Sequence, residues 1–256
     1  HQQFFTLVGP LNDGDLDSDL IQIPMEFSAA MVTFSLSLDG SCVCDVILRD
    51  SLGNLIPVAE TNGRHYVWRA SAPRSGNWTL FIDKRFIGPN AAESASPDQT
   101  EQLPPYLVQG AVKSDAILDV ALPVPVEERL VGTPMPIIAS FADVAPITGA
   151  TVWASVVTPS NATWIVTLRD DGLHDDGVAN DGLYGGTFYR TGEGGSTSGA
   201  GSYNVTVTGI GNSSVAGTVV RQKVLGFFMY SSGDDDMDLI PNEVEIRYSG
   251  SPTALD

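Results

Sequence analysis

Apolar and polar residues alternate along residues 31–38, and this pattern restricts the folds open to the chain. In Met-Val-Thr-Phe-Ser-Leu-Ser-Leu, every second residue is apolar and the residues between are small and polar. Successive side chains of a strand point to opposite faces, so this pattern predicts a strand with one buried and one solvated face. Similar short runs recur at 42–49, 77–82 and 106–112, and no segment has the sustained spacing of an amphipathic helix. The chain is therefore predicted to be all-β.

The length of 256 residues is enough for two domains of ordinary size, each with its own core. Prolines interrupt the strand pattern at the start of the second predicted domain, and a new series of strands follows. We expect a jelly-roll-like β-sandwich at 1–122, an immunoglobulin/fibronectin III-like β-sandwich at 123–230, and a short calcium-loop tail at 231–256. Trp78 is expected to anchor the first core and Trp153 the second, because each lies in an alternating strand.

Both cysteines of the chain lie in Cys42-Val43-Cys44. In an extended strand, residues two apart share one face at about 6.5–7 Å, which is beyond comfortable disulfide geometry. Two buried thiols, a strained disulfide and an intermolecular disulfide are all compatible with this spacing.

The formal net charge of −18 reflects 31 Asp and Glu against 13 Lys and Arg. Such a field repels nucleic acid phosphates and anionic membrane surfaces, so we expect no nucleic acid partner. No apolar stretch approaches the roughly 20 residues of a membrane-spanning helix, so no direct membrane insertion is expected. Cations are the natural small partners. The expected protein partners are neighbouring domains or copies of the same protein, in a homo-oligomer or a filament.

Four Asn-x-Ser/Thr sequons predict a glycosylated surface and an extracellular or cell-surface location. Their asparagines are Asn77, Asn161, Asn204 and Asn212.

The most specific motif is the acidic run at 234–245, Asp-Asp-Asp-Met-Asp-Leu-Ile-Pro-Asn-Glu-Val-Glu. Calcium takes about six to eight oxygen ligands, which a loop of about twelve residues supplies from alternating positions. Counted from its first residue, the spacing predicts the ligands Asp234, Asp236, Asp238, the carbonyl of Ile240, Asn242 and Glu245. Leu239 stands at position 6, where glycine normally permits the sharp turn, and a solvated acidic tail is the alternative.

The continuation of this run, Asp238-Leu-Ile-Pro-Asn-Glu-Val-Glu245, resembles the thrombospondin type 3 repeat family. Units of that family join acid-alternating loops through a Leu-Pro-Asp step. The resemblance covers one short copy. It implies calcium binding in a spacer, with further repeats downstream in a longer protein.

A second acidic run contains three Asp-Gly steps, at 171, 176 and 181. Glycine permits left-handed turns, so the carboxylates of Asp170, Asp171, Asp176 and Asp181 could converge on one cation. The run predicts a second calcium site. The alternative is a turn-rich hairpin held by Asx turns without metal.

This second run, ending in Asp181-Gly-Leu-Tyr184, resembles a loop of immunoglobulin-like domains in two groups of proteins. These are the calcium-activated chloride channel regulator family and bacterial surface proteins with von Willebrand factor A domains. The matching strands before and after the loop read Thr148-Gly-Ala-Thr-Val-Trp-Ala and Gly201-Ser-Tyr-Asn-Val. The resemblance implies a non-catalytic ectodomain. The von Willebrand A and metal-dependent protease domains of these proteins have no counterpart in this sequence, so their activities are not carried over.

A third acidic run places Glu26 at position 12 counted from Asp15. Position 9 is Ile23, an apolar side chain, and Ile21 and Ile23 fit the inward face of a strand. An acidic loop without metal is therefore the expected reading, with calcium as the alternative.

No catalytic residue is predicted. The three histidines, His1, His65 and His174, stand outside any recognisable nucleophile or zinc motif, and His174 is expected to be a solvated loop residue. An N-terminal His1 that recruits His65 would offer a copper site like that of lytic polysaccharide monooxygenases. No other stretch resembles that family.

These features predict a non-enzymatic, calcium-stabilised extracellular structural or adhesive segment of a surface protein, sheath or appendage. The alternative is an accessory non-catalytic module of a secreted hydrolase. It rests on the stretch from Leu11-Asn-Asp-Gly-Asp to Trp78-Thr-Leu, which resembles the sandwich appended to bacterial secreted proteases.

Overall fold

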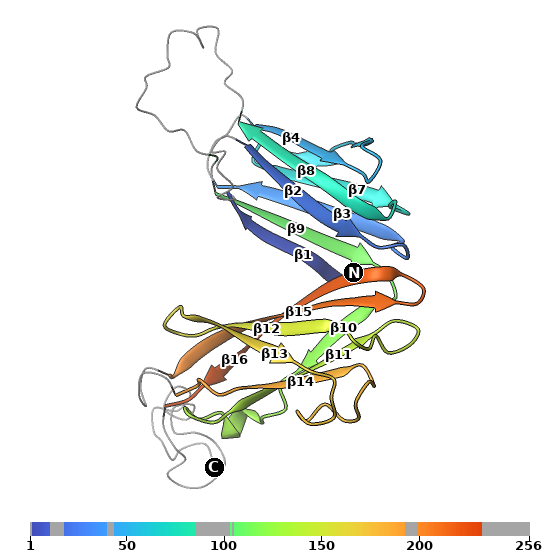
Figure 1. Ribbon diagram of the computed structural model, residues 1–256. Helices are drawn as coiled ribbons and strands as arrows, with labels where there is room; N and C mark the ends of the chain where they lie inside the picture. Colours follow the sequence, from blue (N-terminus) through green and yellow to red (C-terminus); the bar gives the residue numbers. More distant parts are fainter. Residues whose placement is uncertain are drawn as a thin grey trace. The chain divides into compact units, whose positions relative to one another are not determined.

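The computed structural model describes residues 2–10, 18–39, 44–84, 103, 105–192 and 199–231. These residues form sixteen β-strands and one short 3-10 helix, η1 (Val126–Glu128), without any α-helix (Figure 1). The prediction of an all-β chain with consecutive β-sandwiches is confirmed. Turns and loops join the described strands. The described residues include no helix that is long and apolar enough to cross a membrane.

The chain forms two compact units. The first consists of His1–Asp115 with Ser213–Arg221, and the second of Ala116–Asn212 with Gln222–Asp256. The predicted domain boundary lies between residues 122 and 123. It implies that the parts on either side fold independently, and it stays a prediction. Of the predicted tail, all residues after Ser231 lie outside the described ones.

The first unit is built from two antiparallel sheets (Figure 1). One has the order β1-β9-β3-β7-β6: Gln2–Gly9, Tyr106–Lys113, Met31–Leu38, His65–Ser71 and Glu60–Thr61. The other has the order β2-β8-β4-β5: Ser18–Met25, Gly76–Lys84, Cys44–Arg49 and Leu55–Ile56. Both sheets contribute buried side chains to one apolar cluster, which makes this unit a β-sandwich.

The alternation that predicts strand β3 also determines its buried face. Its residues are buried at every second position, from Val32 to Leu38. The ring of Phe34 lies 5.7 Å from that of Phe4 and 6.0 Å from that of Trp78, centroid to centroid. Trp78 is 1% exposed and donates its indole N–H to the carbonyl of Arg74 at 2.7 Å. Its predicted place in the first core is confirmed.

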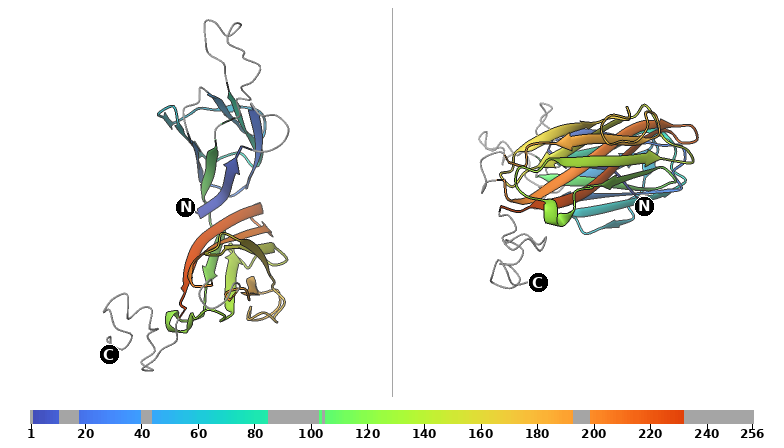
Figure 2. Two further views of the ribbon diagram at one scale, coloured as in Figure 1. Left: turned by 90° about the vertical axis from the view of Figure 1, so that its left-hand side faces the viewer. Right: turned by 90° about the horizontal axis from the view of Figure 1, so that it is seen from below.

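The second unit also has two sheets, and the long strands β15 and β16 run side by side in one of them (Figure 2). The three-stranded sheet has the order β10-β11-β14: Ile117–Ala121, Met135–Ala142 and Leu183–Phe188. The four-stranded sheet has the order β13-β12-β15-β16: Thr163–Leu168, Thr151–Val157, Gly201–Ser213 and Gly217–Met229. The end of β15 and the start of β16, within Ser213–Arg221, belong to the first unit. Their shared core includes Phe188, Tyr203 and Phe227, and the last two rings stack at 4.7 Å.

The prediction that Trp153 anchors the second core is wrong. Its neighbours Val152 and Ala154 are buried, while Trp153 itself is only half-buried. Adjacent residues of a strand face opposite sides, so the burial of Val152 and Ala154 turns Trp153 away from the core. The large side chain of Trp153 therefore does not determine which face of β12 is buried.

Cys44, the first residue of β4, is disulfide-bonded and packs against the first core. This excludes a free thiol at Cys44. Cys42 lies outside the described residues.

Phe34→Ala should lower the free energy of unfolding by about 3–5 kcal/mol, because it removes a buried ring from an aromatic cluster and leaves a cavity. Val8→Ala is the control, since Val8 is 72% exposed and should change stability by less than about 0.5 kcal/mol. Chemical denaturation followed by tryptophan fluorescence measures both. Equal losses in the two variants would contradict this assignment of the core.

Candidate functional site

The acidic loop, residues 169–182, connects β13 to β14 in the second unit. Its base is closed by two backbone hydrogen bonds of 2.8 Å between Arg169 and Gly185. A side chain at Gly185 would collide with the carbonyl oxygen of His174, so glycine is what lets the loop lie against β14. Asp175 and Asn180 adopt positive φ angles of 58° and 64°, which Asp and Asn tolerate better than most residues.

Asp176 is the centre of the loop. Its side chain is buried, and Oδ2 accepts hydrogen bonds from the N–H groups of Asp171 at 2.6 Å and Gly172 at 2.8 Å. Oδ1 accepts one from the N–H of His174 at 2.9 Å. Burial opposes ionisation and would raise the pKa of Asp176, but these N–H donors outweigh it and hold the pKa at about 2.

The other carboxylates of the loop are bound in the same way. Asp170 accepts the N–H groups of Asp181 and Gly182, each at 3.1 Å. Asp181 in turn accepts those of Leu183 at 2.9 Å and Val178 at 3.0 Å. Both carboxylates therefore fix turns of the loop.

His174 is half-buried and forms a 2.8 Å contact from Nδ1 to Oδ1 of Asp171. The same oxygen accepts the N–H of Leu173 at 3.0 Å. His174, which we expected to be solvated, is therefore held within the acidic loop by the carboxylate of Asp171.

Calcium requires about six to eight oxygens that converge on one centre. Within the part of the chain that the structure describes, no group of three or more His, Cys, Asp or Glu side chains is placed to hold a metal ion. The acidic loop as arranged does not fit a calcium cage, since its carboxylates point at backbone N–H groups. Calcium at Asp170, Asp171, Asp176 and Asp181 stays a prediction.

The C-terminal calcium motif lies outside the described residues. This applies to all six predicted ligands: Asp234, Asp236, Asp238, Ile240, Asn242 and Glu245.

A cavity of about 410 Å³ borders the acidic loop. Its polar lining includes Thr151, Thr167, Arg169, Asp171, Asn180 and Tyr184. The Tyr184 hydroxyl donates to the carbonyl of Ile147 at 2.7 Å and accepts the N–H of Ala150 at 2.9 Å, and burial raises its pKa. The volume of the cavity falls within the range of small-molecule sites, and its lining carries charges of both signs, from Arg169 and from Asp170 and Asp171.

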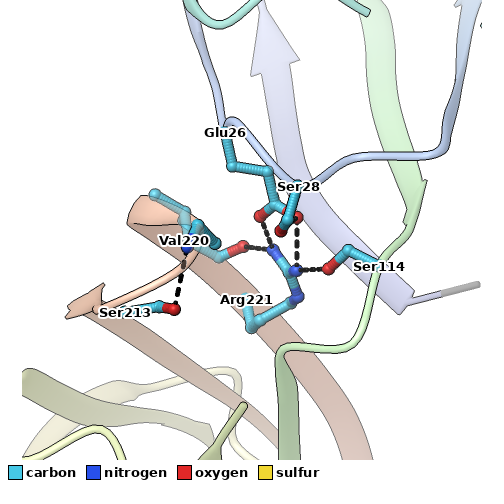
Figure 3. Close-up of polar contacts among 7 residues, drawn as sticks. Glu26, Ser28, Ser114, Ser213, Val220 and Arg221 are labelled. Carbon is cyan, nitrogen blue, oxygen red and sulfur yellow. Dashed lines mark hydrogen bonds and ion pairs between the residues drawn. The ribbon is translucent and has the colours of Figure 1, made fainter. Parts of the chain in front are cut away.

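The first unit holds the most deeply buried ion pair among the described residues (Figure 3). The Arg221 guanidinium donates from Nη1 to Oε2 of Glu26 at 2.6 Å and from Nη2 to Oε1 at 2.9 Å. It also donates to the Val220 carbonyl at 2.8 Å and to the hydroxyl of Ser114. The side chains of Arg221 and Glu26 are 0% and 4% exposed.

Sequence reasoning missed this pair. It considered Glu26 only as the end of the third acidic run, whereas the carboxylate binds Arg221. Asp19 of the same run is also buried and accepts the hydroxyl of Tyr106 at 2.5 Å. One sequence signal could have revealed the pair: Arg221 is a basic residue on the inward side of an apolar strand, two positions after the buried Val219.

The asparagines of the four sequons are all exposed. These are Asn77, Asn161, Asn204 and Asn212. Their side chains are therefore accessible, as glycosylation requires.

Ser37 and His65 face each other across strands β3 and β7, with Oγ and Nδ1 2.9 Å apart. A catalytic base also needs a third group that orients its ring. Among the described residues, no carboxylate contacts the other nitrogen of His65, so the pair supports no catalytic assignment. His1, which the copper alternative requires, lies outside the described residues.

A family model described as the second Ig-like domain of conditioned medium factor matches residues 140–223, which is less than half of the chain. The match confirms the expected immunoglobulin-like domain. It does not confirm the chloride channel regulator or von Willebrand type, nor the calcium loop. No curated protein matches the chain.

Solved structures similar to the chain include the following two. A DUF4785 family protein from Legionella pneumophila has a TM-score of 0.50 and 10% identity, covering 90% of this chain and 65% of that one. The propeptide form of a Bacillus licheniformis lipase has a TM-score of 0.47 and 12% identity, covering 89% and 41%. The chain thus spans less than two thirds of either protein, and the Legionella structure supports the fold alone.

Asp176→Asn should lower stability at pH 7, because it leaves backbone donors of the acidic loop without a carboxylate. The folded pKa of Asp176, about 2, lies below the ordinary value of 3.8. Its contribution is therefore full above about pH 4 and is lost as the pH falls towards about 2. The variant should show a shallower loss of stability across that window.

Urea unfolding midpoints between pH 7 and pH 2 measure this effect. Asp175→Asn is the matched control, since Asp175 is exposed and adjacent. If the two variants show the same pH dependence, Asp176 is not the carboxylate that holds the loop.

Proposed function

We propose that this chain is a non-catalytic structural or adhesive segment of an extracellular surface protein, sheath or appendage. The chain is similar to an immunoglobulin-like domain over residues 140–223, within two β-sandwich units. The observation that carries the proposal is the acidic loop. Its carboxylates accept hydrogen bonds from backbone N–H groups and so stabilise a turn.

The extracellular part of the proposal is supported by the four exposed sequon asparagines. The net charge of −18 disfavours binding to nucleic acids and anionic lipid. The partners proposed are therefore neighbouring domains or copies of the same protein.

Calcium enters the proposal through the spacing of the run at 234–245. Carboxylates at alternating positions repel one another until a cation neutralises them, so calcium bound there would relieve this repulsion. The acidic loop is the weaker candidate, because its carboxylates would first have to exchange their N–H donors for the ion.

Glu245→Gln should weaken calcium binding at least about tenfold, because Glu245 is the residue at position 12 that supplies two oxygens. Glu243→Gln is the matched control, since position 10 supplies no ligand in this spacing. Calorimetric titration of the full chain measures both. Unchanged affinity in Glu245→Gln, or equal losses in both variants, would contradict the ligand assignment.

The structural role predicts that millimolar calcium raises the melting temperature of the chain and that a chelator reverses the rise. Ligand present at about 100 times its Kd stabilises the folded state by about 2.7 kcal/mol. Sedimentation velocity with and without calcium tests self-association. A chain that is monomeric in both conditions and has one melting temperature would contradict a calcium-stabilised assembly role.

A further inference from the structure

A fully buried arginine is unusual in a protein core, because removing its charge from water is costly. Arg221 meets that cost with a paired geometry: both terminal nitrogens bind the Glu26 carboxylate, at 2.6 and 2.9 Å. The Val220 carbonyl and the Ser114 hydroxyl accept further hydrogen bonds from it. Ser28 donates to Oε1 of Glu26 at 3.4 Å (Figure 3).

These groups come from widely separated parts of the sequence. Glu26 follows β2, Ser114 follows β9, and Arg221 lies on β16, 195 residues after Glu26. All three belong to the first unit, which takes in Ser213–Arg221 in addition to His1–Asp115. The first unit is therefore completed by a segment from late in the chain.

The same segment makes a second, backbone contact with the first unit. The N–H of Phe27 donates to the carbonyl of Ala216 at 3.1 Å. Ser213 shapes the turn that presents this carbonyl, since its Oγ accepts the N–H groups of Val215 at 3.1 Å and Ala216 at 3.0 Å. Gly217 has a φ of +71°, and a Cβ there would lie 3.0 Å from the ring of Phe27.

We propose that residues 213–221 are a strap that the first unit requires, and that the Arg221–Glu26 pair holds it in place. Without the strap, Glu26 would lose its bidentate partner and Phe27 would lose its backbone acceptor. An uncompensated buried charge destabilises a fold far more than the pair stabilises it. The first unit thus reaches its full stability only after the chain has been synthesised through Arg221. This inference is independent of the proposed calcium role.

Amide hydrogen exchange of the full chain tests the strap, because the Phe27 N–H reports directly on the contact with Ala216. Arg221→Met should accelerate exchange at Phe27 at least tenfold, and Glu26→Met should do the same. The double variant Glu26→Met/Arg221→Met should recover most of the protection, because it removes both charges together.

Lys223→Met is the matched control. Lys223 lies two residues further along β16 and pairs with Asp119 at 3.0 Å, but these side chains are 43% and 69% exposed. It should leave Phe27 protected. The Tyr230 N–H, bonded to the Arg129 carbonyl in the second unit, should exchange at the wild-type rate in every variant.

Unchanged exchange at Phe27 in Arg221→Met, or equal acceleration in Lys223→Met, would overturn the proposal. A double variant that stays unprotected would also overturn the role of the charge pair, since packing would then explain the loss. If Arg221→Met does not accumulate as folded protein, Arg221→Lys replaces it. Lysine keeps the charge without the two-pronged geometry, so partial loss of protection is expected and full protection would overturn the proposal.

Discussion

The register in which neighbouring strands pair determines which side chains each sandwich buries. Side chains alternate along a strand, so a slip of one residue in β3 would turn Val32, Phe34 and Leu36 out of the core. The central position of β3 fixes its register from both sides. Phe34 is opposite Trp68 on β7 and Gly110 on β9. A Cβ at Gly110 would lie 2.8 Å from the ring of Phe4 and 3.0 Å from that of Phe34, so the aromatic cluster requires glycine at that position.

Backbone N–H groups accommodate part of the strong negative charge of the chain. In the first unit, Oδ1 of Asp50 accepts the N–H groups of Leu52 and Asn54, each at 2.9 Å, and shapes the turn after β4. The pKa of Asp50 lies below its ordinary value, chiefly because the side-chain amide of Asn54 donates a hydrogen bond to its carboxylate. Asp176 stabilises the acidic loop in the same way. A carboxylate in such a turn stays ionised because local donors stabilise its charge.

How far the sequence predicts the structure depends on the range of the interaction. The two-residue period of β3 is local, and it correctly predicted which side chains are buried. The same reasoning failed at Trp153. Which residues of β12 face the core follows from the pairing of that strand with β13 and β15. For the acidic loop, the Asp-Gly spacing predicted turns, but whether the carboxylates point at an ion or at N–H groups depends on backbone angles that the spacing leaves open.

The Arg221–Glu26 pair marks the limit of such reasoning. Its partners are 195 residues apart, so no local pattern selects Glu26 from the 31 acidic residues of the chain. The pair also discriminates between registers more sharply than an apolar contact would. A one-residue slip of β16 would point Arg221 outward and bring Gln222 inward, leaving the Glu26 carboxylate buried opposite a neutral amide. Apolar side chains can exchange places at moderate cost, whereas a buried carboxylate tolerates few neighbours other than a cation. The buried charges therefore favour one register of the hairpin formed by β15 and β16 more strongly than hydrophobic burial alone does.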